Sequence, residues 1–319
     1  MKPPHAFITG IAGFAGSFLA EELLAHNYQV SGSMLGRESS RNIRTIQNEL
    51  NIIKLDVLKP NECRRRIKQL NPDYIFHLAA FSSVGQSFKN ETLTYKVNFE
   101  GTLNVLNASL EAKNLAKLVF TSSADCYGAF KPVNKTLTEN QAFNPISPYA
   151  VSKTAAELLC NFYVSRYQMP ITIARSFNHT GPRQTDNFVV SSFARQIAQI
   201  EKTGGEPIIH VGDLSTKRDF SDVRDIVSGY RRLAERGQPG SAYHFCSGKA
   251  VTIKQILEML LKLSSKTIIV KTDNSRLRKN DIPSLKGDNT KARKKIGFSP
   301  KYTLNQTLQD TLNYWRETL

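Results

Sequence analysis

The sequence predicts an α/β fold in which a doubly wound parallel sheet is covered by helices on both faces, beside a smaller mixed α/β lobe. Two observations support this prediction. Short apolar segments alternate with segments of helical periodicity from residue 5 to residue 178. Three glycines, Gly10, Gly13 and Gly16, separate the first apolar segment from the first helical one. Such alternation is typical of parallel strands joined by helical crossovers.

The elements of the first half follow in order along the chain. Buried parallel strands read as short apolar runs, and we expect them over residues 5–10, 28–35, 51–57, 73–80, 116–125 and 170–178. Helices are expected over residues 11–27, 61–71, 94–114 and 148–167. Ser147 is a good N-cap and Pro148 suits the first helical position, so these two residues mark the start of the last helix.

The order of elements becomes less regular after about residue 180. Helices are expected over residues 187–202, 222–237 and 252–265, and strands over residues 207–212, 242–248 and 267–272. No linker separates the two halves of the chain, so we expect them to pack as one unit.

The composition excludes several classes of protein. The chain has 319 residues, of which 40% are hydrophobic, and it contains no apolar run long enough for a transmembrane helix. Its first ten residues do not resemble a secretory signal. The four cysteines form no CxxC pair, so we expect free thiols and a cytoplasmic protein. The six histidines show no metal-ligand spacing, and no metal site is predicted.

The chain is strongly basic, because lysine and arginine outnumber aspartate and glutamate by 43 to 27. Two clusters contribute to this excess, at residues 64–68 and 291–295. Neither cluster is interleaved with aromatic residues, so solvated helix faces are favoured over a nucleic-acid surface. A third interpretation is that part of the excess attracts an anionic cofactor and an anionic substrate. We expect neither a nucleic-acid partner nor a membrane partner.

The three glycines have the spacing GxxGxxG and lie directly after the first strand. They permit a tight turn and let a pyrophosphate approach the helix N-terminus, where free N–H groups favour negative charge. We therefore predict a dinucleotide-binding Rossmann domain over residues 1–175, with Phe14 and Ala15 in the same cofactor-binding turn. Residues 176–319 are predicted to form mainly a substrate lobe, with segments that return to the Rossmann domain.

The end of the second strand should lie near the adenosine ribose of a dinucleotide. Its sequence, LGRESSR, supplies two guanidinium groups and two hydroxyls, which suit a 2′-phosphate: Arg37, Ser39, Ser40 and Arg41. This favours NADP over NAD, although Glu38 could serve an unmodified ribose and NAD stays possible. Asp56 and Val57 end the third strand at a place suited to adenine, where Asp56 could equally cap a turn.

Candidate catalytic residues occur beside two predicted element ends. Tyr149 and Lys153 are i and i+4 neighbours on the last helix of the first half, and a nearby ammonium lowers the pKa of a phenol. A tyrosine with a lowered pKa is a usable proton donor or acceptor. The Tyr-x-x-x-Lys pattern also arises by chance, so other motifs must agree with it. Ser122 and Ser123 end the strand over 116–125, and Asp125 follows.

Four motifs in order resemble those of the extended short-chain dehydrogenase/reductase family: GxxGxxG, HLAA at 77–80, SSxxxYG at 122–128 and YxxxK at 149–153. Three further segments, RSFNHTGPRQ, VGDLSTKRDFSDVRD and RLRKNDIP, resemble the GDP-4-keto-6-deoxy-D-mannose reductases, which form GDP-D-rhamnose. The resemblance covers the whole chain.

The resemblance implies roles for individual residues. Ser123, Tyr149 and Lys153 match the catalytic residues of the family. Lys153 would also hold the nicotinamide ribose and lower the pKa of Tyr149. The cofactor-binding positions extend to the HLAA residues Leu78, Ala79 and Ala80. The implied substrate-binding positions are Ser122, Asp125, Asn178, Arg218, Arg278 and Asp281. Taken alone, Arg218 would be expected to pair with Asp219 or Asp222, and Arg278 to lie in a solvated loop.

The implied activity is NADPH-dependent reduction of the C4 ketone of GDP-4-keto-6-deoxy-D-mannose, with Tyr149 as proton donor. The alternative is a GDP-mannose 4,6-dehydratase with tightly bound NADP. The dehydratases carry Thr and Glu where this chain has Ser123 and Asp125, and the shorter side chain of Asp125 weakens that alternative. A UDP-sugar 4-epimerase and a non-catalytic nucleotide-binding or RNA-binding relative are less favoured. The resemblance further implies a homodimer formed through the helices over 94–114 and 148–167.

Overall fold

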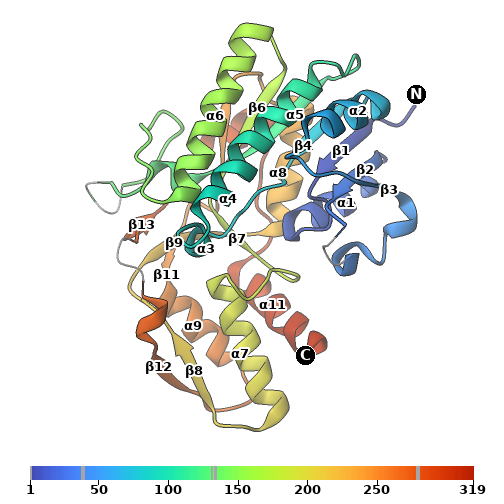
Figure 1. Ribbon diagram of the computed structural model, residues 1–319. Helices are drawn as coiled ribbons and strands as arrows, with labels where there is room; N and C mark the ends of the chain where they lie inside the picture. Colours follow the sequence, from blue (N-terminus) through green and yellow to red (C-terminus); the bar gives the residue numbers. More distant parts are fainter. Residues whose placement is uncertain (1, 37–39, 131, 133–134, 278–280) are drawn as a thin grey trace.

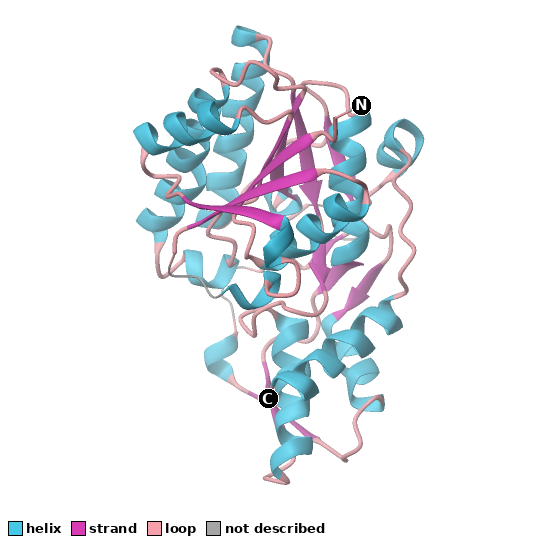
Figure 2. Ribbon diagram, turned by 90° about the vertical axis from the view of Figure 1, so that its right-hand side faces the viewer, coloured by secondary structure: helices cyan, strands magenta, loops and turns pink. Residues whose placement is uncertain are grey.

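A seven-stranded parallel sheet forms the centre of the larger part of the molecule (Figures 1 and 2). The computed structural model describes residues 2–36, 40–130, 132, 135–277 and 281–319. The strands lie in the order β10-β6-β5-β4-β1-β2-β3. Their bounds are β1 His5–Thr9, β2 Gln29–Met34, β3 Leu50–Lys54, β4 Tyr74–His77, β5 Lys117–Ser123, β6 Ile171–Ser176 and β10 Ala242–Phe245. This arrangement confirms the predicted fold class.

Helices cover both faces of this sheet and close two apolar cores. On one face lie α1 Phe14–Ala25 and α8 Val223–Arg236, which pack against each other and share one core with the sheet. On the other face lie α2 Pro60–Leu70, α5 Gly101–Ser109 and α6 Pro148–Tyr167, with a second core beneath them. Both faces are buried, which explains why the strands read as continuous apolar runs.

The helix predicted over residues 94–114 is divided in the structure. It consists of α4 Glu91–Tyr95, a π-helical turn over Lys96–Glu100 and α5, which ends at Ser109. The strand predicted over residues 170–178 is likewise divided into β6 and the short β7 Asn178–Thr180. Shorter elements near this part of the chain are α3 Val84–Ser87 and the 3₁₀ turns Ser40–Ile43, Gln47–Glu49 and Ala124–Tyr127.

The smaller lobe has a core of its own, built from helices and a two-stranded sheet (Figure 1). Its helices are α7 Val189–Thr203, α9 Ile253–Lys262 and α11 Leu304–Thr318, and its parallel strands are β8 Ile208–Val211 and β12 Ile269–Thr272. The helix α11 was not predicted from the sequence. Its N-terminus carries a capping box in which the Thr303 and Gln306 side chains each bind the other residue's backbone N–H.

A third sheet lies between the two cores and connects them (Figure 1). It is formed by β7, β9 Lys217–Asp222, β11 Ala250–Thr252 and β13 Ser284–Leu285. Three segments from the second half of the chain lie on the larger sheet or its helices: α8, β10 and α10 Thr290–Ile296. A further 3₁₀ turn spans Asn274–Arg276. Within the described residues, no helix combines the length and the apolar character that crossing a bilayer requires.

Candidate active site

The glycine turn lies at the carboxyl edge of β1 and opens α1. Gly10 has a φ of 73°, and its N–H donates to the Ser33 carbonyl of β2 at 3.1 Å. A Cβ atom on Gly16 would lie 2.3 Å from the Gly10 carbonyl oxygen, so no side chain fits there. Gly13 occupies the N-cap of α1 and provides no capping side chain. The first N–H groups of α1 are therefore left for an external acceptor, which suits a phosphate.

The HLAA segment follows β4 and lies against the glycine turn. A Cβ atom on Gly10 would lie 3.1 Å from the Cα atom of Ala79. The N–H groups of Leu78 and Ala79 both donate to the Thr9 hydroxyl, at 3.1 and 3.0 Å. Leu78, Ala79 and Ala80 are half-buried. Two of the predicted cofactor-binding segments are thus side by side at the same edge of the sheet.

The segment predicted to bind the 2′-phosphate is described only in part. Arg37 and Ser39 lie outside the described residues. Ser40 is exposed and begins a 3₁₀ turn. In the same turn the Asn42 amide donates to the Ala12 carbonyl of the glycine turn at 3.0 Å, which links the two predicted cofactor segments.

Asp56 and Val57 follow the carboxyl end of β3, as predicted for the adenine side of the site. One carboxylate oxygen of Asp56 accepts from the Leu58 N–H at 2.9 Å, so the residue does cap a turn. Val57 is buried and packs toward Gly101, where a Cβ atom would lie 2.8 Å from a Val57 methyl group.

Ser123 and Tyr149 meet at the carboxyl edge of β5. The Ser147 hydroxyl accepts from the Ala150 N–H at 3.1 Å, and this cap holds the first turn of α6, which carries Tyr149. Ser123 and Asp125 both act on the pKa of the Tyr149 phenol, so the three side chains lie together at this edge. The Ser123 hydroxyl donates to Oδ2 of Asp125 at 3.0 Å.

The electrostatics of Tyr149 differ from the expectation. Burial raises the pKa of Tyr149 above its ordinary value, the Asp125 carboxylate raises it further, and the Ser123 side chain opposes both. We expected Lys153 to lower this pKa, and the structure corrects that expectation. The Lys153 ammonium lies over the Phe120 ring, 4.5 Å from its centroid, and burial dominates the titration of the phenol. Tyr149 is therefore a neutral phenol near pH 7, the form that can donate a proton.

Lys153 lies one helical turn beyond Tyr149 and is only 3% exposed. Burial lowers the pKa of its ammonium to about 8. Among the described residues Lys153 has neither a hydrogen-bond partner nor an ion-pair partner. A buried ammonium without a hydrogen-bond acceptor is costly, so this position is suited to a ligand that brings hydroxyl acceptors.

Ser122 is not brought into this group. Its hydroxyl donates to Glu157 at 2.5 Å, and Glu157 in turn pairs with Arg175 at 2.6 Å. The Arg175 guanidinium also donates to the Tyr127 hydroxyl at 2.6 Å. Ser122 thus belongs to a buried polar network, and its placement does not fit the substrate contact that the resemblance implied.

The predicted substrate residues of the second half lie on the connecting sheet and just before it. Asn178 begins β7 and is paired in register with Phe220 of β9. Arg218 of β9 pairs with Asp281 at 2.6 Å and donates to the carbonyls of Lys217 and Ile282. Its partner is therefore neither Asp219 nor Asp222 but another predicted substrate residue. Arg278 lies outside the described residues.

Two polar residues that were not predicted as site residues, Asn98 and Ser152, hold the backbone of Tyr149. The Asn98 amide donates to the Ser152 hydroxyl at 2.9 Å, and that hydroxyl donates to the Tyr149 carbonyl at 2.7 Å. Asn98 and Ser152 are separated by 54 positions. No local spacing rule connects residues so far apart; only the buried polar residues at four-residue spacing, Thr94, Asn98 and Thr102, could have indicated a role.

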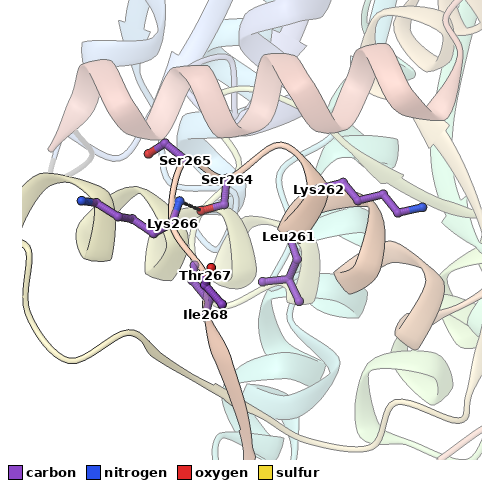
Figure 3. Close-up of a pocket in the computed structure, with 7 residues that line it drawn as sticks. All are labelled: Leu261, Lys262, Ser264, Ser265, Lys266, Thr267 and Ile268. Carbon is purple, nitrogen blue, oxygen red and sulfur yellow. Dashed lines mark hydrogen bonds between the residues drawn. The ribbon is translucent and has the colours of Figure 1, made fainter.

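A shallow pocket of about 450 Å³ lies elsewhere, where α9 leads into β12 (Figure 3). The Ser264 hydroxyl accepts from the Lys266 N–H at 3.1 Å, and the Lys262 and Lys266 side chains extend to opposite sides. Its side chains do not converge on a common point, and we assign no ligand to it. Among the described residues, no group of three or more His, Cys, Asp or Glu side chains could hold a metal ion.

A glycine turn for a dinucleotide, with a serine, a tyrosine and a lysine at the same edge of one parallel sheet, defines a nucleotide-dependent oxidoreductase of the short-chain type. The family model described as GDP-mannose 4,6 dehydratase matches residues 7–311, and the chain belongs to this family.

Relatives of known activity agree with this assignment. The chain is 32% identical to GDP-6-deoxy-D-mannose reductase of Pseudomonas aeruginosa, over 97% of this chain and 96% of that protein. It is 30% identical to GDP-mannose 4,6-dehydratase of Yersinia enterocolitica, over 94% and 91% of the two chains. Among solved structures it resembles RMD from Pseudomonas aeruginosa complexed with NADPH, with a TM-score of 0.85, 30% identity and coverage of 99% and 100%.

Proposed function

We propose that the protein reduces the C4 ketone of GDP-4-keto-6-deoxy-D-mannose to the alcohol of GDP-D-rhamnose, with NADPH as reductant. The observation that carries this proposal is the grouping of Ser123 and Asp125 with the Tyr149 phenol, with the buried Lys153 ammonium one helical turn further along α6. The similarity to a GDP-6-deoxy-D-mannose reductase supports the choice of substrate.

The residues present fit the cofactor. The uncapped start of α1 and the space enforced by Gly16 suit the pyrophosphate, and Lys153 suits the hydroxyls of the nicotinamide ribose. Asn42 ties the adjoining ribose segment to this turn. When bound, NADPH supplies the hydride.

The protein's own side chains transfer the proton to the ketone oxygen. The neutral Tyr149 phenol donates its proton to the ketone oxygen as negative charge develops there. Ser123 lies at the same edge, and its hydroxyl orients the ketone oxygen when it turns its single proton from Asp125 to that oxygen. Until then the Asp125 carboxylate holds the Ser123 hydroxyl in place. Positioning of ketone, phenol and hydroxyl supplies much of the rate.

The diphosphate of the substrate requires donors on the connecting sheet. Of the five N–H donors of Arg218, three are used by Asp281 and two carbonyls, which leaves donors for a phosphate oxygen. Asn178 begins the neighbouring strand β7 and contributes an amide. We assign these two residues to the diphosphate and Asp281 to a hydroxyl or amine of the GDP moiety, as well as to holding Arg218.

The proposed reduction is tested by incubating the protein and NADPH with GDP-4-keto-6-deoxy-D-mannose, and in parallel with GDP-mannose. We expect stoichiometric loss of NADPH absorbance and a GDP-6-deoxyhexose product from the ketone only. Conversion of GDP-mannose without net loss of NADPH would instead establish the dehydratase alternative. A parallel series with NADH measures the cofactor preference.

We also propose that two copies of the chain associate through α6 and its neighbours. Val151, Leu158 and Phe162 are 40%, 55% and 54% exposed and recur along one side of α6 at intervals of seven and four residues. Leu110, 45% exposed, adds to this surface at the end of α5. An apolar stripe of this kind on a helix pair suits a matching helix pair from a second copy.

We place the protein in the cytoplasm on the state of its cysteines. Cys63, Cys126, Cys160 and Cys246 are all free and buried, and burial raises the pKa of each thiol. Thiols of this kind persist in a reducing compartment.

A further inference from the structure

A chain of buried polar side chains runs through the larger domain, from the strand before the glycine turn to the first turn of α6. Its members are Thr9 of β1, His77 of β4, Thr102 of α5, Asn98 of the π-helical turn and Ser152 of α6. Each of these residues is at most 2% exposed. Such a network is informative because every buried polar group in it must find a partner.

The direction of each hydrogen bond around His77 follows from the proton count. The Thr102 hydroxyl donates to the Asn98 carbonyl at 2.6 Å, so its oxygen must accept from Nε2–H of His77 at 3.0 Å. Nδ1 of His77 therefore carries no proton and accepts from the Thr9 hydroxyl at 2.8 Å. Burial, and then the nearby Lys153 charge, lower the pKa of His77 to about 3, so the ring is neutral.

On the cofactor side, the hydrogen-bond network ends at the backbone of the HLAA segment. The Thr9 hydroxyl gives its proton to His77 and uses its oxygen to accept from the N–H groups of Leu78 and Ala79. Ala79 is the residue that lies against Gly10 of the glycine turn. Through Thr9, His77 thereby holds the HLAA backbone, which packs against the glycine turn.

On the catalytic side, the bond from Thr102 ends at the backbone carbonyl of Asn98, and a second set of bonds starts from the Asn98 side chain. The Asn98 side chain accepts from the Phe81 N–H at 2.7 Å and donates to the Phe81 carbonyl at 3.1 Å and to Ser152 at 2.9 Å. Ser152 donates to the carbonyl of Tyr149. The same network therefore reaches the backbone of the proposed proton donor.

We propose that His77 is a positioning residue that couples the cofactor-binding turn to the catalytic helix through two runs of hydrogen bonds, which Asn98 joins through its backbone and its side chain. The inference rests on the proposed function. The imidazole suits this role because it presents one donor nitrogen and one acceptor nitrogen on opposite sides of a rigid ring. A fully paired polar network in a low-dielectric interior holds its members in one arrangement.

Two substitutions at His77 each break one of its two hydrogen bonds and keep the other. In His77→Asn, the amide oxygen can take the place of Nδ1 and keep the bond from Thr9, while the bond to Thr102 is lost. In His77→Gln, the amide nitrogen can take the place of Nε2 and keep the bond to Thr102, while the bond from Thr9 is lost. His26→Asn, at an exposed histidine on the last turn of α1, is the control.

The two variants should fail in different ways. His77→Gln should weaken NADPH binding by about tenfold and keep kcat at saturating cofactor, because one lost buried hydrogen bond corresponds to a change of this size. His77→Asn should keep the NADPH Kd and lower kcat by about tenfold. Binding is measured by NADPH fluorescence without any sugar, and kcat by NADPH oxidation with the 4-keto sugar.

Equal effects of both variants on Kd and kcat, or a lower melting temperature with unchanged kinetics, would overturn the inference. If either variant fails to fold, Thr9→Val and Thr102→Val repeat the test, with Thr9→Val affecting Kd and Thr102→Val affecting kcat. Absence of turnover by the wild-type protein would refute the proposed substrate only. The Kd comparison would still stand, and a matching displacement of Tyr149, read from its NMR signals in the two variants, would replace kcat.

Discussion

Tyr149 is held in position at both its backbone and its side chain. Its backbone is held from below by Ser152 and Asn98, and its phenol is held at the sheet edge by Ser123. Burial and the Asp125 carboxylate raise the pKa of the phenol, so the proton is retained until a developing alkoxide accepts it. This arrangement favours the direction in which a ketone is reduced.

Replacing Tyr149 with phenylalanine should lower kcat by about 10²–10⁴-fold, because the proton donor is removed while the ring and its packing stay. NADPH binding should change little. The measurement is steady-state NADPH oxidation with the 4-keto sugar, with Tyr314→Phe on α11 of the smaller lobe as the matched control. Activity of the Tyr149 variant within a few-fold of wild type would show that another group donates the proton.

The buried histidines make stability depend on pH. Burial lowers the pKa of His77 and of His244 to about 3, far below the ordinary value of 6.5. Unfolding in weakly acidic solution therefore takes up protons, so stability is complete above about pH 6.5 and is lost as the pH falls toward 3. Between pH 6 and 5, each histidine should contribute about 1.2 kcal/mol to this loss.

Urea unfolding at pH 8, 7, 6 and 5 measures this loss. His77→Asn should make the slope below pH 6.5 shallower by less than half, because burial also lowers the pKa of His5 and of His179. His26→Asn, at an exposed position, is the control. Stability that does not vary between pH 7 and pH 5 would contradict the prediction.

At the scale of elements, the glycine turn depends on close backbone contact. In Gly16→Ala, the added methyl group would lie 2.3 Å from the Gly10 carbonyl oxygen and 3.0 Å from Ile11. The turn must widen, and we expect a loss of about 1–3 kcal/mol of stability together with an NADPH Kd raised by about tenfold or more. Gly205→Ala is the control, because its nearest neighbour atom would lie 3.5 Å away. Equal NADPH affinities of the two variants would refute the assignment of the turn.

The elements predicted from the sequence are those marked by a pattern among residues close together in the sequence. Strands buried on both faces read as apolar runs, and Ser147 with Pro148 marked the start of α6. β9 was not expected, because its residues Lys217–Asp222 do not alternate in polarity and its stability comes from pairing with β7, β11 and β13. α11 was missed although Thr303 and Gln306 form a readable capping box.

The site residues that could be predicted from the sequence are those that belong to family motifs. Ser123 and Tyr149 were expected together, and the structure brings them together. The partner of Ser122 depends on which side of β5 its hydroxyl faces, and the pairing of Arg218 with Asp281 joins residues 63 positions apart. The spacing of residues along the sequence determines neither a side-chain rotamer nor a long-range contact. The partners of Ser122 and Arg218 are therefore seen only in the folded structure.

At the scale of the whole molecule, the exposed apolar side of α6 predicts association of two copies. The wild-type protein should sediment with about twice the chain mass of 35.8 kDa at micromolar concentration. Leu158→Glu combined with Phe162→Glu should yield the single-chain mass, because charge would be buried at the contact. Ile269→Glu on β12 is the control, since Ile269 is 56% exposed and lies in the smaller lobe. Wild type at the single-chain mass would rule out the proposed dimer.

The return of β10 to the edge of the larger sheet also limits how this chain can be cut or recombined. A polypeptide that stops before residue 242 would leave β6 as the outermost strand, with its amide and carbonyl groups and the side chains of Ile171 and Ile173 deprived of a neighbour. An open, apolar edge of this kind recruits strands from other molecules and leads to aggregates. Swapping substrate specificity between relatives thus demands at least two crossover points, so that the guest segment is inserted between β6 and β10 and the cofactor half keeps its own last strand.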